Sequence, residues 1–381
     1  FIYVHWRFLW LVARNLWPPR GGFGGRSLRH VLAMVAFVPA FYFLLLFQWI
    51  GLRLDELIFR GYRRVDVREP VFVLGVPRSG TTFLHRLLAS DPRFTTFSTW
   101  ECLLAPSISE RFLWLGIARL DGLLGSPLGR LVKILEGWIF GWFDDVHPVS
   151  LSAPEEDYFV LLPLLSCFIL VVPFPRSRWI WRMGTLDRDA SDAEGDAIMR
   201  WYRRCLQRHL YVHGTERTLL SKNASFAGMA GSLCRAFPDA CVIICERDAV
   251  QVIASQFRAV TESMKLFGVP LNDVGFRENL LDCLQFYYTN LDRVLEESVP
   301  CARRVSLPVL SRNPLDTMTA LYEELFVRAM PVELRQEIHA YEQHGRNATR
   351  TGDIGLSTWG IRESEVCTRF AAWRESEEIW T

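Results

Sequence analysis

A short loop rich in Gly, Ser and Thr is the first stretch of the sequence that could do chemistry. The loop GVPRSGTT carries one cation, Arg78, and follows an apolar run at 71–75. Such a run, bounded by turn residues, predicts a buried strand, and the apolar spacing from Thr81 to Leu88 predicts a helix after the loop. A strand, a glycine-containing loop and a helix N-terminus direct backbone N–H groups at an anion. The sequence therefore predicts a phosphate site here.

The spacing of the two glycines matches that of a nucleoside-triphosphate loop, with one difference. Thr81 follows Gly80 at the position where such loops have the Lys that reaches the β- and γ-phosphates. Arg78 is the only cation inside the loop. The loop therefore favours a phosphate ligand that is not a magnesium-bound triphosphate. A P-loop nucleotide kinase or NTPase stays as the alternative function.

At these residues the sequence resembles the sulfotransferases that use 3′-phosphoadenosine 5′-phosphosulfate (PAPS). PRSGTT resembles their 5′-phosphosulfate loop, and CVIICERDAVQVIAS resembles their second element, a strand, an Arg and a helix that carries a Ser. The resemblance covers roughly 65–373. It implies PAPS as co-substrate without a metal, with Arg247 and Ser255 at the 3′-phosphate. It also implies that the 5′-phosphate is held by Arg78, Ser79, Gly80, Thr81 and Thr82.

Three further residues are candidates for the transfer step. The resemblance to tyrosylprotein sulfotransferases makes Glu101 a candidate base, and the alternative is an acid at a helix start. His147 has an imidazole suited to general base catalysis, and cytosolic sulfotransferases place their catalytic His at a similar distance from the loop; it is otherwise a polar loop residue. Lys222 follows a predicted strand, and we expect it to stabilise charge on the transferring sulfuryl group.

The acids of Pro154-Glu155-Glu156-Asp157 precede a long apolar run. Pro at the first helical position and acids in the first turn predict a helix start, with a buried helix that continues to Val172. We interpret the acids as helix caps, with the alternative that one of them orients His147 or binds the acceptor.

The fold class follows from apolar runs that alternate with helical patterns. Predicted strands near 71–75, 218–221, 241–245 and 304–310 indicate an α/β protein, a P-loop-type parallel sheet flanked by helices. Ligands of such sheets lie at the carboxyl ends of the strands, where Arg78, Lys222 and Arg247 fall. We predict a hydrophobic N-terminal segment at 1–64 and a sulfotransferase-like domain at 65–381. Two helices within 111–142 are expected to line the acceptor site.

The N-terminal segment contains a run, 31–52, without a charged residue. This length suffices to cross a bilayer, although Pro39 would kink the helix. A helix that spans, a helix that lies in one leaflet and a helix that packs on the domain all stay open. We predict membrane association, with the catalytic domain on the cytoplasmic side.

Composition narrows the class of partner. The net charge is +1, which gives no basic field for nucleic acid. The nine cysteines lack metal-binding spacing, and we interpret them as reduced thiols, mostly in the core. The predicted acceptor is a hydroxyl or amine of a small molecule, glycan or lipid, with a hydrophobic acceptor favoured by the apolar walls. A catalytically inactive nucleotide-binding membrane protein is the remaining alternative.

Overall fold

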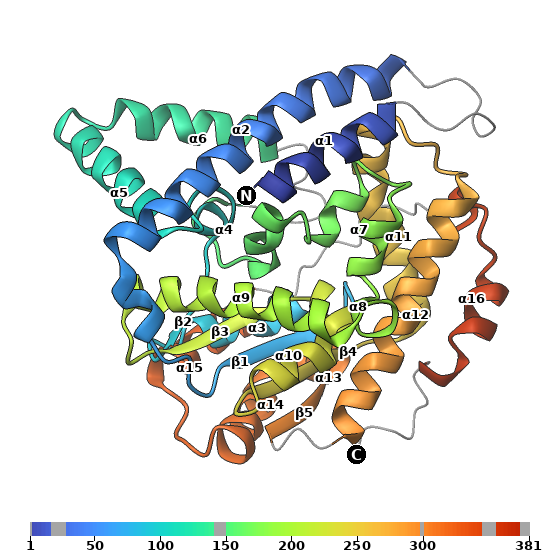
Figure 1. Cartoon of the computed structure of the whole chain (residues 1–381). Helices are drawn as coiled ribbons and strands as arrows, with labels where there is room; N and C mark the ends of the chain where they lie inside the picture. The colour runs from blue at the N-terminus through green and yellow to red at the C-terminus, as the bar shows by residue number, and fades with distance from the viewer. Residues whose placement is uncertain (1, 17–27, 141–149, 298–300, 345–355, 374–381) are drawn as a thin grey trace.

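The structure is a computed structural model that describes residues 2–16, 28–140, 150–297, 301–344 and 356–373. Its centre is a five-stranded sheet with strand order β2-β3-β1-β4-β5, and every strand pair is parallel (Figure 1). The parallel α/β architecture predicted from the sequence is confirmed. The strands are β1 (Val71–Gly75), β2 (Phe94–Thr95), β3 (Thr218–Lys222), β4 (Cys241–Glu246) and β5 (Cys301–Ser306).

Strand β1 lies in the middle of the sheet and is buried along its whole length. A strand covered on both faces is apolar at every position, which is why its sequence shows no polar alternation. Its side chains still alternate in direction: Val71 and Val73 pack into one buried cluster, and Phe72 and Leu74 into another. The two clusters are the two sides of the core.

Helices cover both faces of the sheet (Figure 1). On the Val71 side the core contains residues of five elements: α3 (Thr81–Ala89), α13 (Leu307–Arg312), α14 (Pro314–Ala320), the π-helical turn η5 (Leu321–Leu325) and α15 (Val332–His344). On the Phe72 side it contains residues of α9 (Asp192–His213), α10 (Ala230–Ala236), α11 (Ala249–Leu266) and α12 (Val274–Glu296).

A second group of helices lies at one end of the molecule, at the top of Figure 1. It consists of α1 (Ile2–Leu16), α2 (Leu28–Ile58), α5 (Ile108–Leu123) and α6 (Pro127–Phe140), with α4 (Thr99–Leu104) beneath them. The 31-residue α2 contains Pro39 and is long and apolar enough to cross a membrane, and 17% of its apolar window is buried. Phe8 of α1 and Leu45 of α2 belong to the same core cluster as Phe72.

The remaining elements connect these layers. They are α7 (Arg178–Met183), α8 (Leu186–Asp189), α16 (Glu363–Arg369) and the 3-10 turns η1 (Arg60–Arg64), η2 (Asp157–Leu164), η3 (Phe168–Val171), η4 (Ser225–Met229), η6 (Leu356–Trp359) and η7 (Ala371–Trp373).

Two predicted elements were wrong. The buried helix expected up to Val172 is instead a pair of 3-10 turns, η2 and η3, because Pro163 interrupts the backbone donors and Leu165 adopts a left-handed φ of 57°. The strand expected at 304–310 ends at Ser306, and α13 follows with Pro308 in its first turn.

The expectation that all cysteines are reduced was also wrong for one pair. Cys241 and Cys301 are directly opposite each other on β4 and β5 and form a disulfide. Sixty residues separate them in the sequence, so nothing local indicates the pair. Cys245 is a buried free thiol, as predicted.

Candidate active site

The loop between β1 and α3 has the predicted strand–loop–helix geometry. Gly80 is the N-cap of α3 and has a φ of 97°, a conformation in which glycine is strongly favoured. A Cβ at this position would lie 2.5 Å from Leu307 Cδ1, so any other residue would also have to displace the Leu307 side chain. Arg78 likewise has a positive φ, 74°. The chain turns tightly enough here to direct the first turn of α3 back at the end of β1.

This turn offers hydrogen-bond donors to an anion. The first N–H groups of a helix have no acceptor within the helix, and the helix dipole favours negative charge at this end. The Ser79 hydroxyl is buried and has no hydrogen-bond partner among the described residues. A buried polar group without a partner is costly, and a bound oxyanion would supply the missing acceptor.

Arg78, Arg247 and Ser255 meet beside this loop, although they are far apart in the sequence. Arg78 Nε donates to Ser255 Oγ at 3.0 Å, and Arg247 Nη1 donates to the Arg78 carbonyl oxygen at 3.3 Å. Gln251 Oε1 holds the Arg247 guanidinium through two further hydrogen bonds, at 3.0 and 3.1 Å. Because β1 and β4 are neighbours, their parallel strands place both arginines at the same sheet edge.

The cations in this group repel one another. Burial lowers the pKa of Arg78, and the nearby charges of Arg247 and Arg258 lower it further. Positive charge that is concentrated and partly removed from water stabilises a multivalent anion. The arrangement therefore suits a ligand with phosphate groups.

Lys222 lies on the opposite side of the loop, at the end of β3. Its Nζ is 3.3 Å from Thr82 Oγ1, 3.1 Å from Glu156 Oε1 and 3.6 Å from Glu155 Oε1. Lys222 thus bridges the phosphate loop and two carboxylates. Burial raises the pKa of Glu156, an effect that Lys222 opposes, so this acid is a stronger proton acceptor once ionised than an exposed one.

A buried polar network fixes the segment that carries Glu156. Asp157 accepts hydrogen bonds from Tyr202 Oη at 2.7 Å and Ser221 Oγ at 3.0 Å, and the backbone N–H of Tyr158 donates to Asn223 Oδ1 at 2.9 Å. Burial raises the pKa of Asp157 to about 7, against these hydrogen bonds. The network ties the segment after Glu156 to the end of β3, next to Lys222.

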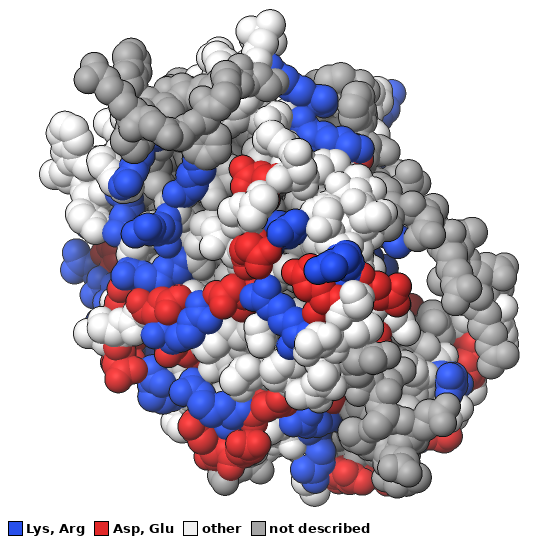
Figure 2. All heavy atoms as spheres, turned by 90° about the vertical axis from the view of Figure 1, so that its right-hand side faces the viewer, with Lys and Arg blue, Asp and Glu red and all other residues white. Residues whose placement is uncertain are grey.

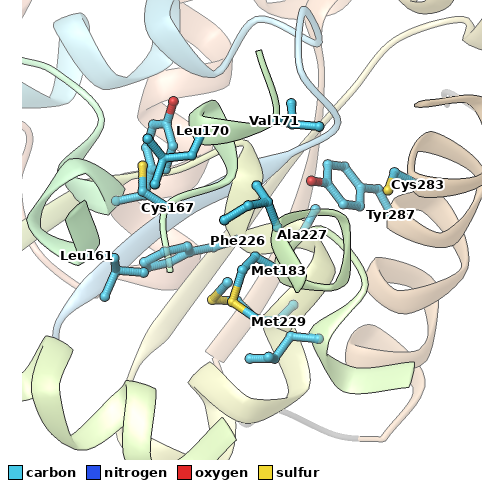
Figure 3. Close-up of a cluster of buried hydrophobic side chains, with 14 of the residues drawn as sticks. Leu161, Cys167, Leu170, Val171, Met183, Phe226, Ala227, Met229, Cys283 and Tyr287 are labelled. Carbon is cyan, nitrogen blue, oxygen red and sulfur yellow. The ribbon is translucent and has the colours of Figure 1, made fainter. Parts of the chain in front are cut away.

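These groups border a cavity of about 420 Å³. Arg78, Gly80, Thr81, Thr82, Glu156 and Arg247 line its polar side. Its apolar side includes Phe168, Val171, Phe276 and Leu280. Figure 3 shows the packing behind this wall, where Val171, Tyr287 and Cys283 approach the cluster around Phe226 and Ala227. None of the described residues of α5 or α6 lines the cavity, so the expectation that these helices wall the acceptor site was wrong.

Glu101 lies elsewhere. Its side chain closes a capping box with Ser98 at the start of α4, and Oε1 is 2.6 Å from His213 Nε2 and 3.6 Å from Arg111 Nη1. Glu101 is buried and is not among the cavity residues. Burial would raise its pKa, but Arg111 and His213 outweigh burial and hold the pKa well below its usual range. The local geometry is that of the helix-start alternative.

Glu101, His209 and His213 bring three potential metal-ligand atoms within 4.8 Å of one another. Arg111 Nη1 lies 3.4 Å from His209 Nδ1 and 3.6 Å from Glu101 Oε1. The guanidinium therefore already supplies a positive charge to this group. The other candidate base, His147, lies outside the described residues.

Comparison with known proteins decides the family. Residues 70–331 match the family model described as the sulfotransferase family. The chain belongs to the sulfotransferase family. None of the curated protein sequences matches it significantly. The match includes the loop of Arg78 and ends within the segment after β5, so it contains all the groups that border the cavity.

Solved sulfotransferases share the fold. The crystal structure of sulfotransferase STF1 from Mycobacterium tuberculosis is 19% identical in sequence and has a TM-score of 0.71. The match covers 97% of this chain and 92% of that one. That of STF9 from Mycobacterium avium is 17% identical, with a TM-score of 0.68 and coverage of 96% of this chain and 94% of that one. At this identity the likeness shows the fold and nothing finer.

Sequence reasoning did not single out Glu156 as a cavity residue, although it left open that one of the acids of its motif binds the acceptor. The motif Pro154-Glu155-Glu156-Asp157 was interpreted as a helix start, and in the structure Glu156 is the extended N-cap residue of the 3-10 turn η2. The available signal was charge: Lys222 was the predicted cation, and a buried cation requires a nearby acid.

Proposed function

We propose that this sulfotransferase moves a sulfuryl group from PAPS to a hydroxyl or amine of an acceptor. The observation that carries the proposal is the convergence of Arg78, Arg247 and Ser255 beside the loop, with Lys222 across the cavity. In this proposal Arg247 and Ser255 bind the 3′-phosphate. Arg78 and the loop residues Ser79, Gly80, Thr81 and Thr82 bind the 5′-phosphate.

The reaction is an in-line displacement at sulfur. The acceptor oxygen or nitrogen forms a bond to sulfur, the bond from sulfur to the 5′-phosphate oxygen breaks, and 3′-phosphoadenosine 5′-phosphate (PAP) leaves. Lys222 and the loop N–H groups stabilise the negative charge that develops on the departing oxygen. No metal takes part in this scheme.

The acceptor proton requires a base at the cavity. We propose Glu156, because it lines the cavity and contacts Lys222 at 3.1 Å. Burial raises its pKa toward the range in which a carboxylate is an effective base. Glu101 is the weaker proposal, because its carboxylate is held by His213 and Ser98. His147 stays a prediction.

The acceptor is proposed to be hydrophobic or lipid-linked, because aromatic and aliphatic side chains form one wall of the cavity. We further propose that the N-terminal segment, 1–64, associates with a membrane and leaves the catalytic domain on the cytoplasmic side. The state of Cys241 and Cys301 in cells tests the sidedness. The disulfide in the structure favours an oxidising compartment, so reduced thiols in cells would support the cytoplasmic side and an intact disulfide would contradict it.

A transfer assay tests the proposed chemistry. Wild-type protein is incubated with PAPS labelled on sulfur and with a panel of phenols, alcohols, amines and extracted lipids. Lys222→Met is expected to lose transfer to every acceptor. Lys265→Met is the matched control, because Lys265 is an exposed lysine that pairs with Glu262 on α11. Equal transfer by both variants refutes the role of Lys222.

The kinase alternative predicts a different dependence. It requires transfer of phosphate from ATP with magnesium, and the loop has Thr81 where a Lys would reach the terminal phosphates. The same panel with ATP labelled on its terminal phosphate distinguishes the two. Phosphate transfer without sulfuryl transfer contradicts our proposal.

A further inference from the structure

Most of the exposed large apolar side chains among the described residues lie on α1, α2, α5 and α6. Trp6 of α1, Phe43 of α2 and Ile134 of α6 are exposed by 68%, 69% and 69%. The four helices share one end of the molecule (Figure 1). We call their exposed apolar side chains, up to residue 137, the apolar platform. Monomeric soluble proteins rarely expose a contiguous apolar patch above a few hundred Å².

The hairpin of α5 and α6 projects from the body of the molecule at the upper left of Figure 1. Leu123 and Leu124 at its turn are exposed by 83% and 77%. The turn is nevertheless well ordered by hydrogen bonds, since the Asp121 carboxylate accepts from the backbone N–H groups of Leu128 and Gly129, both at 2.8 Å. The hairpin therefore holds two exposed leucines in a fixed position at its tip.

Helix α2 is attached to the catalytic domain along its whole length. His30 Nδ1 donates to the Phe267 carbonyl oxygen at 2.6 Å near its start, and Gln48 Nε2 donates to the Leu103 carbonyl oxygen at 2.8 Å. Near its end Asp55 accepts from Arg208 Nε at 2.9 Å. A helix held in this way cannot stand across a bilayer unless the domain enters the lipid with it. It can lie parallel to the surface of one leaflet.

The exposed charged side chains of the four helices are basic. The acids Asp55, Glu110 and Asp121 are buried, and Glu56 is bound by Tyr62 and Arg208. Glu136 of α6 is partly buried and accepts a hydrogen bond from the backbone N–H of Leu151. Basic residues remain exposed on these helices, among them Arg53, Arg119, Arg130 and Lys133. The face seen in Figure 2, by contrast, mixes basic and acidic residues. Apolar side chains surrounded by basic ones match the anionic headgroups of a phospholipid leaflet.

We propose that the apolar platform docks into one leaflet of an anionic phospholipid bilayer, with α2 parallel to the surface and the hairpin of α5 and α6 inserted. This inference deepens the membrane association proposed above and does not depend on sulfuryl transfer. It assigns a role to α5 and α6 and excludes a spanning α2. Helix α2 also contacts η2 and α11, which contribute Tyr158 and Val260 to the cavity, so docking would bring the cavity close to lipid.

Vesicle flotation with the purified full chain tests the proposal. The vesicles are phosphatidylcholine alone or an equal mixture of phosphatidylcholine and phosphatidylglycerol. The hairpin variant Leu123→Glu/Ile134→Glu changes two exposed residues and should fold normally. Val332→Glu is the matched control, because Val332 is 63% exposed on α15, outside the platform. Arg130→Glu/Lys133→Glu tests the preference for anionic lipid.

The proposal expects wild type and Val332→Glu to float with the mixed vesicles and less with phosphatidylcholine alone. The hairpin variant should bind at least about tenfold more weakly, because an acid in the apolar layer costs more than the free energy of one tenfold step. Arg130→Glu/Lys133→Glu should lose the preference for phosphatidylglycerol. Protease added outside sealed vesicles should remove an N-terminal tag, because α2 does not cross.

Three results overturn the proposal. Binding of the hairpin variant equal to that of wild type would overturn it, because α2 alone would then carry the binding. Protection of the tag from external protease would overturn it, because protection shows that α2 crosses. A wild-type dimer that does not bind vesicles, together with a monomeric hairpin variant, would show that a second copy of the chain covers the apolar platform. PAP titration of the same preparations separates a failure of docking from a failure of the donor site.

Discussion

Gly80 allows the geometry of the phosphate loop to be tested with one methyl group. A left-handed backbone costs a residue other than glycine about 1–2 kcal/mol, and φ here is 97°. The new Cβ would also lie 2.5 Å from Leu307 Cδ1, and overpacking of this kind costs about 1–3 kcal/mol. Gly80→Ala should therefore lower the free energy of unfolding by about 2–5 kcal/mol. It should also weaken PAP binding, because the loop N–H groups are displaced.

Gly125→Ala is the matched control. Gly125 has a φ of 79° and no atom within 4 Å of its added Cβ, so only the backbone cost of about 1–2 kcal/mol applies. Leu307→Ala in the Gly80→Ala background should remove the overpacking and so restore that share of the unfolding free energy. The double-mutant cycle should give a coupling energy of about 1–3 kcal/mol between the two positions. Urea unfolding followed by circular dichroism gives each value. Equal losses for Gly80→Ala and Gly125→Ala, without coupling to Leu307, would refute the argument that Leu307 restrains the loop.

Three further predictions concern charges and the disulfide. Lys222→Gln should lower kcat by about 10²–10³ and move the acidic limb of the pH profile upward, because Lys222 opposes the raised pKa of Glu156; an unmoved limb contradicts Glu156 as the base. Burial raises the pKa of Glu110 from 4.5 to about 7, so its protonated form is favoured on folding. Its stabilising contribution is present below pH 4.5 and is lost as the pH rises to 7, by about 3 kcal/mol. Urea unfolding should show a smaller loss over this window in Glu110→Gln, and parallel curves would exclude Glu110 as the cause. Reduction of Cys241–Cys301 should lower the free energy of unfolding by about 4 kcal/mol, measured with and without dithiothreitol; no change would show that the bond does not form in solution.

Local sequence patterns were enough for the centre of the fold. The continuous apolar run of β1 and the helical spacing after Thr81 specify a strand, a loop and a helix without reference to the rest of the chain. The same holds for β4 and the start of α11, where Asp248 caps the helix and fixes the direction that brings Ser255 back toward Arg78. Where the local spacing of apolar residues alone decides whether a segment is a strand or a helix, the sequence is sufficient to predict it.

The remainder depends on contacts between distant residues. Glu156 and Lys222 meet because Asp157 and Tyr158 are hydrogen-bonded to Ser221 and Asn223 at the end of β3. A pattern of acids after a Pro equally favours a helix start. The pairing of Cys241 with Cys301 depends on the register of β4 and β5. The exposure of α5 and α6 could not be read from their composition, since apolar helices are buried in most folds and these project from the sheet.

The most direct test of the central claim is calorimetric titration with PAP and, separately, with ATP and magnesium. Wild type should bind PAP and not ATP, and Arg247→Ala should lose PAP binding, because Arg247 lies against Arg78 at the cavity. Arg335→Ala, which changes an exposed residue of α15, is the control and should bind PAP as wild type does. ATP binding without PAP binding would contradict the sulfotransferase proposal. PAP binding that survives Arg247→Ala would contradict the proposed donor site.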